Sequence, residues 1–196
     1  AEVARYFELL GHSRIVSVGS IGESHEERPI PVAVIADPPV SFDVDGPEEG
    51  VIGDRLVVLL FGSIHAGELC GTDALVRLMA SITGLEDGIV GGEGGELALL
   101  LEKLVVCVVP IYNVDGHAQF GADNRPGQNG PAEMGRRPNA QGLDLNRDWV
   151  KMDAPETRAM VRFLNNWDPA VIVDTHTTNG SNHRFTLTYQ GPILPA

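Results

Sequence analysis

Two apolar runs constrain the fold of this chain most strongly. Residues 55–62 (RLVVLLFG) are apolar after the initial arginine, and residues 104–111 (LVVCVVPI) are apolar throughout. A strand with one face in water alternates polar and apolar residues, whereas a strand in the middle of an α/β sheet is covered on both faces and is apolar at every position. The two runs therefore predict central strands with helices on both sides of the sheet.

Helical and further strand patterns surround these runs. Apolar residues recur at helical spacing in two sets: Leu75, Leu78, Met79 and Ile82, and Met160, Phe163, Leu164 and Trp167. Gly84 predicts the end of the first helix, and Asp153 with Glu156 resembles a capping box at the start of the second. β-branched residues at 14–21 and 30–37, joined by a polar turn, predict an antiparallel hairpin.

Residues 170–175 (AVIVDT) and 184–189 (RFTLTY) predict two more strands. Strands that alternate with helices indicate an α/β fold, here a three-layer α/β/α sandwich with a mixed, mostly parallel central sheet. A chain of 196 residues is long enough for a single domain over residues 1–196 with a substantial core.

Two segments interrupt the regular pattern. Residues 84–95 hold six glycines and predict an inserted loop, not a domain boundary. Residues 112–152 are rich in Gly, Pro, Asn and Arg, and a connection of this length in a compact domain usually carries function.

Composition excludes some partners. The chain has 27 acidic and 14 basic residues, a formal net charge of −13 that would repel a nucleic-acid backbone. It has no run of eighteen apolar residues, so membrane insertion is not expected. Cys70 and Cys107 lie in a predicted helix and a predicted strand, which favours two small buried side chains over a disulfide.

Two histidines follow predicted strands and suggest a metal site. His65 comes after the strand at 55–62, and His176 comes after the strand at 170–175. Functional sites of open α/β sheets gather beyond the carboxyl ends of the strands. Glu68 would lie in the first turn of the next helix, where the helix dipole favours a carboxylate. Two histidines and one carboxylate, with a fourth position for water, are a common ligand set for catalytic zinc.

The loop at 136–149 (RRPNAQGLDLNRDW) has the residues needed to bind an anion. Arg147 can hold a carboxylate through two hydrogen bonds, and Asn146 can add another donor. The alternative is an ordinary surface loop in which Asp144 and Arg147 pair with each other.

The motifs taken together resemble the zinc carboxypeptidases of the M14 family. The resemblance rests on the order and spacing of HAGE (65–68), NVDG (113–116), RPNAQGLDLNR (137–147) and DTH (174–176). It implies that His65, Glu68 and His176 hold one zinc ion per chain. It also implies that Asp144 orients His65, since such a partner fixes the imidazole tautomer.

The same resemblance implies an activity. The chain would belong to a metallocarboxypeptidase that hydrolyses C-terminal peptide bonds with a metal-activated water molecule. Arg137 would stabilise the developing oxyanion, and Asn146 with Arg147 would bind the free C-terminal carboxylate of the peptide substrate. A secreted or periplasmic location is usual for similar proteins.

Two departures from the family pattern affect these expectations. Gly67 stands where the family usually has an arginine, which removes a charge that would help to position substrate. The family's general-base glutamate and specificity pocket come well after the third metal ligand, so they are expected beyond Ala196. A 196-residue piece would then lack its C-terminal part, can be inactive on its own, and would expose a sheet edge through which it can self-associate.

Two other functions fit the same residues. Aspartoacylase and succinylglutamate desuccinylase relatives also carry His-x-x-Glu, an Asn-Arg pair and a later histidine, and they hydrolyse small N-acyl amino acids. The third reading is a non-catalytic module that holds a metal and binds free C-termini through Asn146 and Arg147.

Overall fold

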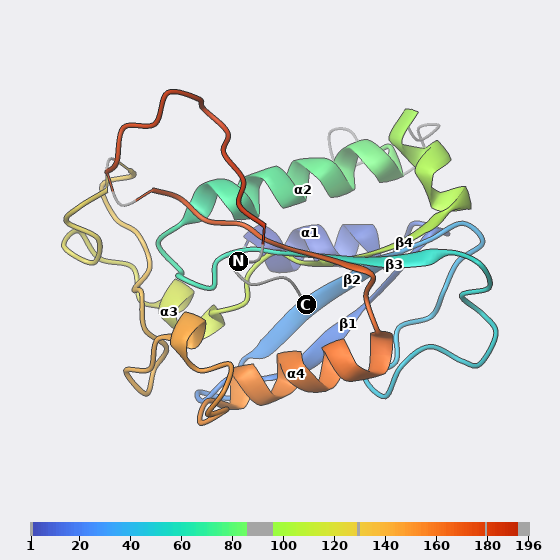
Figure 1. Cartoon of the computed structure of the whole chain (residues 1–196), viewed down its shortest axis with the longest axis horizontal. Helices are drawn as coiled ribbons and strands as arrows, with labels where there is room; N and C mark the ends of the chain where they lie inside the picture. Colours follow the sequence, from blue (N-terminus) through green and yellow to red (C-terminus); the bar gives the residue numbers. More distant parts are fainter. Residues whose placement is uncertain (1, 86–95, 129, 179, 192–196) are drawn as a thin grey trace.

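The protein has a central five-stranded sheet with helices on both faces (Figure 1). The structure is a computed structural model that describes residues 2–85, 96–128, 130–178 and 180–191. The strands are β1 (Val16–Glu23), β2 (Pro29–Ile35), β3 (Leu56–Phe61), β4 (Leu104–Val109) and β5 (Val171–Asp174). The helices are α1 (Glu2–Leu10), α2 (Leu69–Thr83), α3 (Val114–Ala118) and α4 (Pro155–Trp167), with 3-10 turns η1 (Glu96–Glu102) and η2 (Leu145–Arg147).

The strand order across the sheet is β1-β2-β4-β3-β5. The pairs β1–β2 and β2–β4 are antiparallel, and the pairs β3–β4 and β3–β5 are parallel. The predicted hairpin, both central strands and the mixed sheet are therefore confirmed. Parallel pairs make up half of the described pairings instead of most of them, because the hairpin joins the parallel strands through a second antiparallel pair.

Two apolar clusters fill the space between the sheet and its helices. Helices α1 and α2 pack on one face and α4 on the other, which confirms the three layers (Figure 1). Strand β4 supplies both clusters because alternate residues of a strand point to opposite faces: Val105 and Cys107 join the α4 side, and Val106 and Val108 join the α2 side. A strand covered on both sides has to be apolar at every position, which is the pattern that predicted it.

The predicted helix at 75–82 is α2, and Gly84 is its C-cap as expected. In α4 the predicted capping box is wrong. The N-cap residue is Ala154, without a side-chain cap, and the Asp148 carboxylate accepts from the Asp153 and Ala154 amides instead. Glu156, which would complete the capping box, is fully buried and accepts a hydrogen bond from the Asn139 side chain. Its carboxylate is therefore used in a tertiary contact instead of in the cap.

Two other predictions fail. Residues 184–187 form bends, no residue of 184–189 pairs as a strand in the described structure, and Phe185, Leu187 and Tyr189 are exposed. Alternating residues predict a strand only where a neighbouring strand supplies hydrogen bonds, and none of the described strands pairs with this segment. Cys70, in the first turn of α2, is exposed, whereas Cys107 is buried as predicted. The sequence patterns did not reveal α1.

The long irregular segment 112–152 is confirmed: its described residues form the short pieces α3 and η2 and one isolated bridge between Gly121 and Met134. Most of the glycine-rich segment 84–95 lies outside the described residues. Strand β5 is an edge of the described sheet, and its Val171, Ile172 and Val173 are 49%, 49% and 41% exposed. Self-association through this edge stays a prediction. None of the described helices has the length and apolarity that crossing a bilayer requires.

Candidate metal centre

The carboxyl ends of two neighbouring parallel strands bring the two histidines together. β3 pairs with β5 so that Phe61, the last residue of β3, lies opposite Asp174, the last residue of β5. His65 follows four residues after Phe61, and His176 follows two residues after Asp174. The two imidazole ring centres are 5.2 Å apart. The predicted placement of both histidines beyond the strand ends is confirmed.

A tight turn brings Glu68 back toward His65. The Glu68 amide donates to the His65 carbonyl oxygen at 2.9 Å, and Glu68 is the N-cap residue of α2, one position before the helix. The Thr72 side chain in α2 holds this turn to the chain on either side of it. Its hydroxyl contacts Ser63 Oγ at 2.8 Å and donates to the Pro110 carbonyl oxygen at 2.7 Å. Glu68 therefore lies one position before the first helical turn in which it was expected, where the helix N-terminus still favours the ionised carboxylate.

Close approach of α2 to the end of β5 sets the position of His176. A methyl group on Gly71 would lie 2.1 Å from Thr175 Oγ1, which is far inside van der Waals contact. The same Thr175 hydroxyl and its amide both donate to the Phe61 carbonyl oxygen at 3.0 Å. The helix and the strand end can therefore meet only because residue 71 has no side chain, and His176 is the next residue along the chain.

Replacing Gly71 with alanine is expected to move Thr175 and, with it, His176. Forcing an extra carbon into a packed contact costs about 1–3 kcal/mol, so the free energy of unfolding should fall by that amount in thermal or urea denaturation. Zinc affinity, measured by competition with a chelator, should fall as well. Gly127→Ala is the control because nothing lies within 4 Å of a Cβ at residue 127. Unchanged stability in G71A would contradict this account of the packing.

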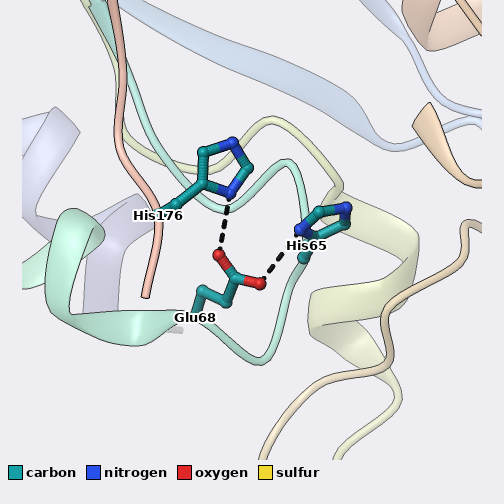
Figure 2. Close-up of side chains that lie close together, drawn as sticks. All are labelled: His65, Glu68 and His176. Carbon is teal, nitrogen blue, oxygen red and sulfur yellow. Dashed lines mark hydrogen bonds and ion pairs between the residues drawn. The ribbon is translucent and has the colours of Figure 1, made fainter. Parts of the chain in front are cut away.

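The Glu68 carboxylate lies between the two imidazoles (Figure 2). Glu68 Oε1 is 2.9 Å from His65 Nδ1, and Glu68 Oε2 is 2.9 Å from His176 Nδ1. One ligand atom from each of the three residues lies within 4.8 Å of the others. This spacing, together with two imidazole nitrogens and one carboxylate, is a donor set that fits a zinc ion.

Both Nε2 atoms point away from this centre toward other carboxylates. His65 Nε2 is 3.1 Å from Asp144 Oδ1, and His176 Nε2 is 2.8 Å from Asp174 Oδ2. The partner predicted for His65 is thus in place. The arrangement leaves Nδ1 of each ring facing the centre, so the nitrogens that would bind a metal are the ones nearest Glu68.

Electrostatics favour an ionised Glu68. Burial alone would raise the pKa of this carboxyl, but hydrogen bonds from the two histidines, from the Thr177 amide and from Arg125 outweigh burial and hold the pKa well below its usual range. Hydrogen bonds to Asp174 and to Glu68 raise the pKa of His176 to about 9. A metal ion that binds His176 Nδ1 must therefore displace a proton at neutral pH.

Arg137 and Asp144 form a pair beside the centre. The Arg137 guanidinium donates from Nε to Asp144 Oδ2 at 3.0 Å, and its Nη1 lies 3.4 Å from His65 Nδ1. Burial would raise the pKa of the Asp144 carboxyl, but hydrogen bonds with Arg137 and His65 hold it below its usual value. Arg137 is one-third exposed and lies next to the His65 nitrogen that faces Glu68.

Asn146 and Arg147 follow Asp144 in η2. Asn146 Nδ2 lies 3.4 Å from His176 Nε2, so this amide borders the centre. Arg147 is exposed, and it donates to the Asn146 carbonyl oxygen at 2.7 Å. The alternative pairing of Arg147 with Asp144 is not formed, since Asp144 pairs with Arg137.

Sequence reasoning missed Arg125, which is held against Glu68. Arg125 Nη2 donates to Glu68 Oε1 at 2.9 Å, and both side chains are almost fully buried. A Cβ on Gly67 would lie 2.6 Å from Arg125 Cγ, so the glycine makes room for the arginine. The positive charge is therefore not lost from the neighbourhood of residue 67, but it is turned inward toward Glu68. No local pattern signals this contact, because 57 residues separate the two side chains.

Two residues of the NVDG motif connect α3 to neighbouring loops. The Asn113 side chain caps α3 by accepting from the Gly116 amide, and its Nδ2 donates to the Arg137 carbonyl oxygen. Asp115 lies in the first turn of α3 and is fully buried. Its carboxylate accepts from the Ser24 hydroxyl and from Arg28, so it fastens the β1–β2 turn to α3.

A search of family models matches residues 4–182 to zinc carboxypeptidase. This chain belongs to the zinc carboxypeptidase family. A probable carboxypeptidase 2 of Arthroderma benhamiae is 27% identical over 122 residues, which cover 62% of this chain and 19% of the fungal protein. The human carboxypeptidase N catalytic chain is 24% identical over 188 residues, which cover 83% of this chain and 38% of the human protein.

The fold agrees with that membership. A crystal structure of a metallo-carboxypeptidase from Burkholderia cenocepacia superposes with a TM-score of 0.68 at 20% identity, and the match covers 91% of this chain and 41% of that one. The chain thus spans less than half the length of these relatives. The match to the zinc carboxypeptidase model supports the family predicted from the four motifs, and it favours that family over the aspartoacylase relatives.

Proposed function

We propose that this chain carries the zinc site of a metallocarboxypeptidase that hydrolyses the C-terminal peptide bond of peptides. The observation that carries the proposal is the convergence of His65, Glu68 and His176, with ligand atoms within 4.8 Å of one another. Zinc bound by these residues would polarise the scissile carbonyl group and activate a water molecule. Asp144 would keep His65 in the orientation that presents Nδ1 to the ion.

Arg137 supports the chemical step in this proposal. Its guanidinium is fixed by Asp144 and lies at the edge of the centre, 3.4 Å from His65 Nδ1. A fixed donor at this position can meet the carbonyl oxygen of the scissile bond as it becomes anionic, without reorganising during the reaction. The Asp144 carboxylate thus has two roles, since it holds both a metal ligand and the group that stabilises the oxyanion.

Space for substrate lies next to the metal ligands. A pocket of about 540 Å³ is lined by residues that include Gly67, Cys70, Gln128, Thr177 and Ser181, and its described lining has no charged side chain. The arginine that the family usually has at position 67 would stand here. An uncharged pocket favours peptide side chains that are neutral at this position, because a buried charge without a partner is costly.

The exopeptidase specificity would come from Asn146 and Arg147. Arg147 is exposed, and among the described residues its guanidinium hydrogen-bonds to the neighbouring carbonyl oxygen, which leaves donors available to an incoming carboxylate. Asn146 lies between Arg147 and His176 and adds a donor on the side of the metal. A free C-terminal carboxylate can satisfy both donors, whereas an amide cannot supply the charge.

Amidation of the C-terminus of a test peptide is therefore expected to lower the kcat/KM of the full-length gene product. A hydrogen bond to a charged group contributes about 1.5–3 kcal/mol, so cleavage should slow by roughly 10-fold to 100-fold. Arg147→Met should slow cleavage of the free peptide by a similar factor and leave the amidated peptide almost unaffected. Equal rates on both peptides with the unsubstituted protein would show that these residues do not bind the carboxylate.

Two further assays separate the alternative functions. Faster hydrolysis of an N-acyl amino acid than of a peptide would favour the aspartoacylase-like activity. Tight binding of a carboxylate-terminated peptide without turnover, in the full-length gene product, would identify a non-catalytic binding module. The secreted or periplasmic location stays a prediction.

A further inference from the structure

The carboxylate of Asp174 stands in the same relation to His176 as Asp144 does to His65. Asp174 Oδ2 is 2.8 Å from His176 Nε2, and Asp144 Oδ1 is 3.1 Å from His65 Nε2. In both rings the opposite nitrogen, Nδ1, is 2.9 Å from an oxygen of Glu68. The centre is therefore nearly symmetric: each imidazole lies between Glu68 and a carboxylate of its own.

The contacts of His176 Nε2 indicate that Asp174 determines whether this nitrogen carries a hydrogen. Asn146 Nδ2 lies 3.4 Å from this nitrogen. It is a donor, so Nε2 could accept its hydrogen bond only if Nε2 carried no hydrogen of its own. Asp174 is closer, at 2.8 Å, and an ionised carboxylate only accepts. The shorter and charge-assisted contact prevails, so Nε2 keeps its hydrogen and Nδ1 is the nitrogen from which a metal ion would displace a proton.

The backbone and the environment of Asp174 both fix its position. Asp174 is the last residue of β5 and is held in register opposite Phe61. Its second oxygen, Oδ1, is buried and has no hydrogen-bond partner among the described residues. A buried acceptor without a partner destabilises the folded state, so the fold gives up stability to keep a carboxylate at this place. Such an exception calls for an explanation other than packing.

We infer that Asp174 is a positioning residue that orients His176 for zinc, as the counterpart of Asp144 on the other histidine. This inference rests on the proposed zinc site. The carboxylate would hold the ring so that Nδ1 faces the ion, and would keep the hydrogen on Nε2 when Nδ1 binds. The pair of carboxylates would thereby prepare both histidine ligands before the metal arrives.

The test is zinc affinity of metal-depleted protein, measured by titration with zinc in competition with a chelator. Loss of a partner that orients a ligand typically costs 10-fold to 100-fold in metal affinity, so Asp174→Ala should weaken zinc binding by about that factor. Asp174→Asn should weaken it less, because the amide oxygen can still accept from Nε2. Asp144→Ala provides the benchmark, and Asp153→Ala, which removes an exposed aspartate, should bind zinc like the unsubstituted protein.

Thermal unfolding with and without zinc separates positioning from a structural role. Bound zinc raises the melting temperature in proportion to the logarithm of its affinity, so the increase should be smaller in D174A than in the unsubstituted protein. A structural role would lower both melting temperatures equally and leave zinc affinity unchanged, which would overturn the inference. If D174A does not fold, the isosteric D174N decides by the same two measurements. An unsubstituted protein that binds no zinc would overturn the proposed function itself.

Discussion

Replacing His176 with alanine is expected to lower zinc affinity about 10²-fold to 10³-fold and to abolish peptide hydrolysis. Zinc sites with four protein ligands bind with about 10–16 kcal/mol, so one ligand contributes ~3 kcal/mol, and each 1.4 kcal/mol is a factor of ten. His176 is a favourable position for this test because its side chain is 35% exposed at the edge of the fold. Its removal leaves both apolar clusters intact.

His183→Ala is the matched control for this variant. His183 is the next histidine along the chain and is exposed. Zinc affinity should be unchanged in H183A and strongly reduced in H176A, while circular dichroism of the two variants should be alike. If H176A bound zinc as tightly as the unsubstituted protein, the three residues would not share an ion and the hydrolase proposal would fail with them.

Replacing Arg137 with methionine is expected to lower kcat by about 10²-fold to 10³-fold, the usual cost of removing one donor to a developing oxyanion. The KM for a carboxylate-terminated peptide should change little, because Arg137 would act mainly in the transition state. Arg137 also holds Asp144, so the assay needs enough zinc to saturate the variant. With zinc saturated, a loss of kcat reports on the chemical step alone.

Arg136→Met is the control for the Arg137 variant. Arg136 is adjacent in sequence and exposed, and its guanidinium donates to Gln119 Oε1 at a distance of 3.0 Å. The R136M variant should keep its kcat. An Arg137→Lys variant should recover part of the lost rate, because lysine keeps the charge but lacks the planar fork of donors. A tenfold increase in KM with unchanged kcat in R137M would instead place Arg137 in substrate binding.

Several features followed from local patterns because their causes are local. The apolar runs at 55–62 and 104–111 predicted strands covered on both faces, and β3 and β4 are such strands. Helical spacing with a terminal glycine predicted α2 within a few residues. His65 and His176 were placed at one edge of the sheet because parallel strands end on the same side. Local sequence was misleading at 184–189 and at Asp153, where partners in space decide the outcome.

By itself the sequence determined the class of fold, the three candidate metal ligands and the loop that carries Arg137 and Asp144. Tertiary structure alone decided which nitrogen of each histidine faces the centre and which carboxylate holds the other nitrogen. It also decided that Arg125 pairs with Glu68 in the space left by Gly67. Strand and helix patterns depend on neighbours a few residues away in the sequence. Most of these contacts instead join residues that are far apart in the sequence, and they form only once the sheet has brought the ends of β3 and β5 together.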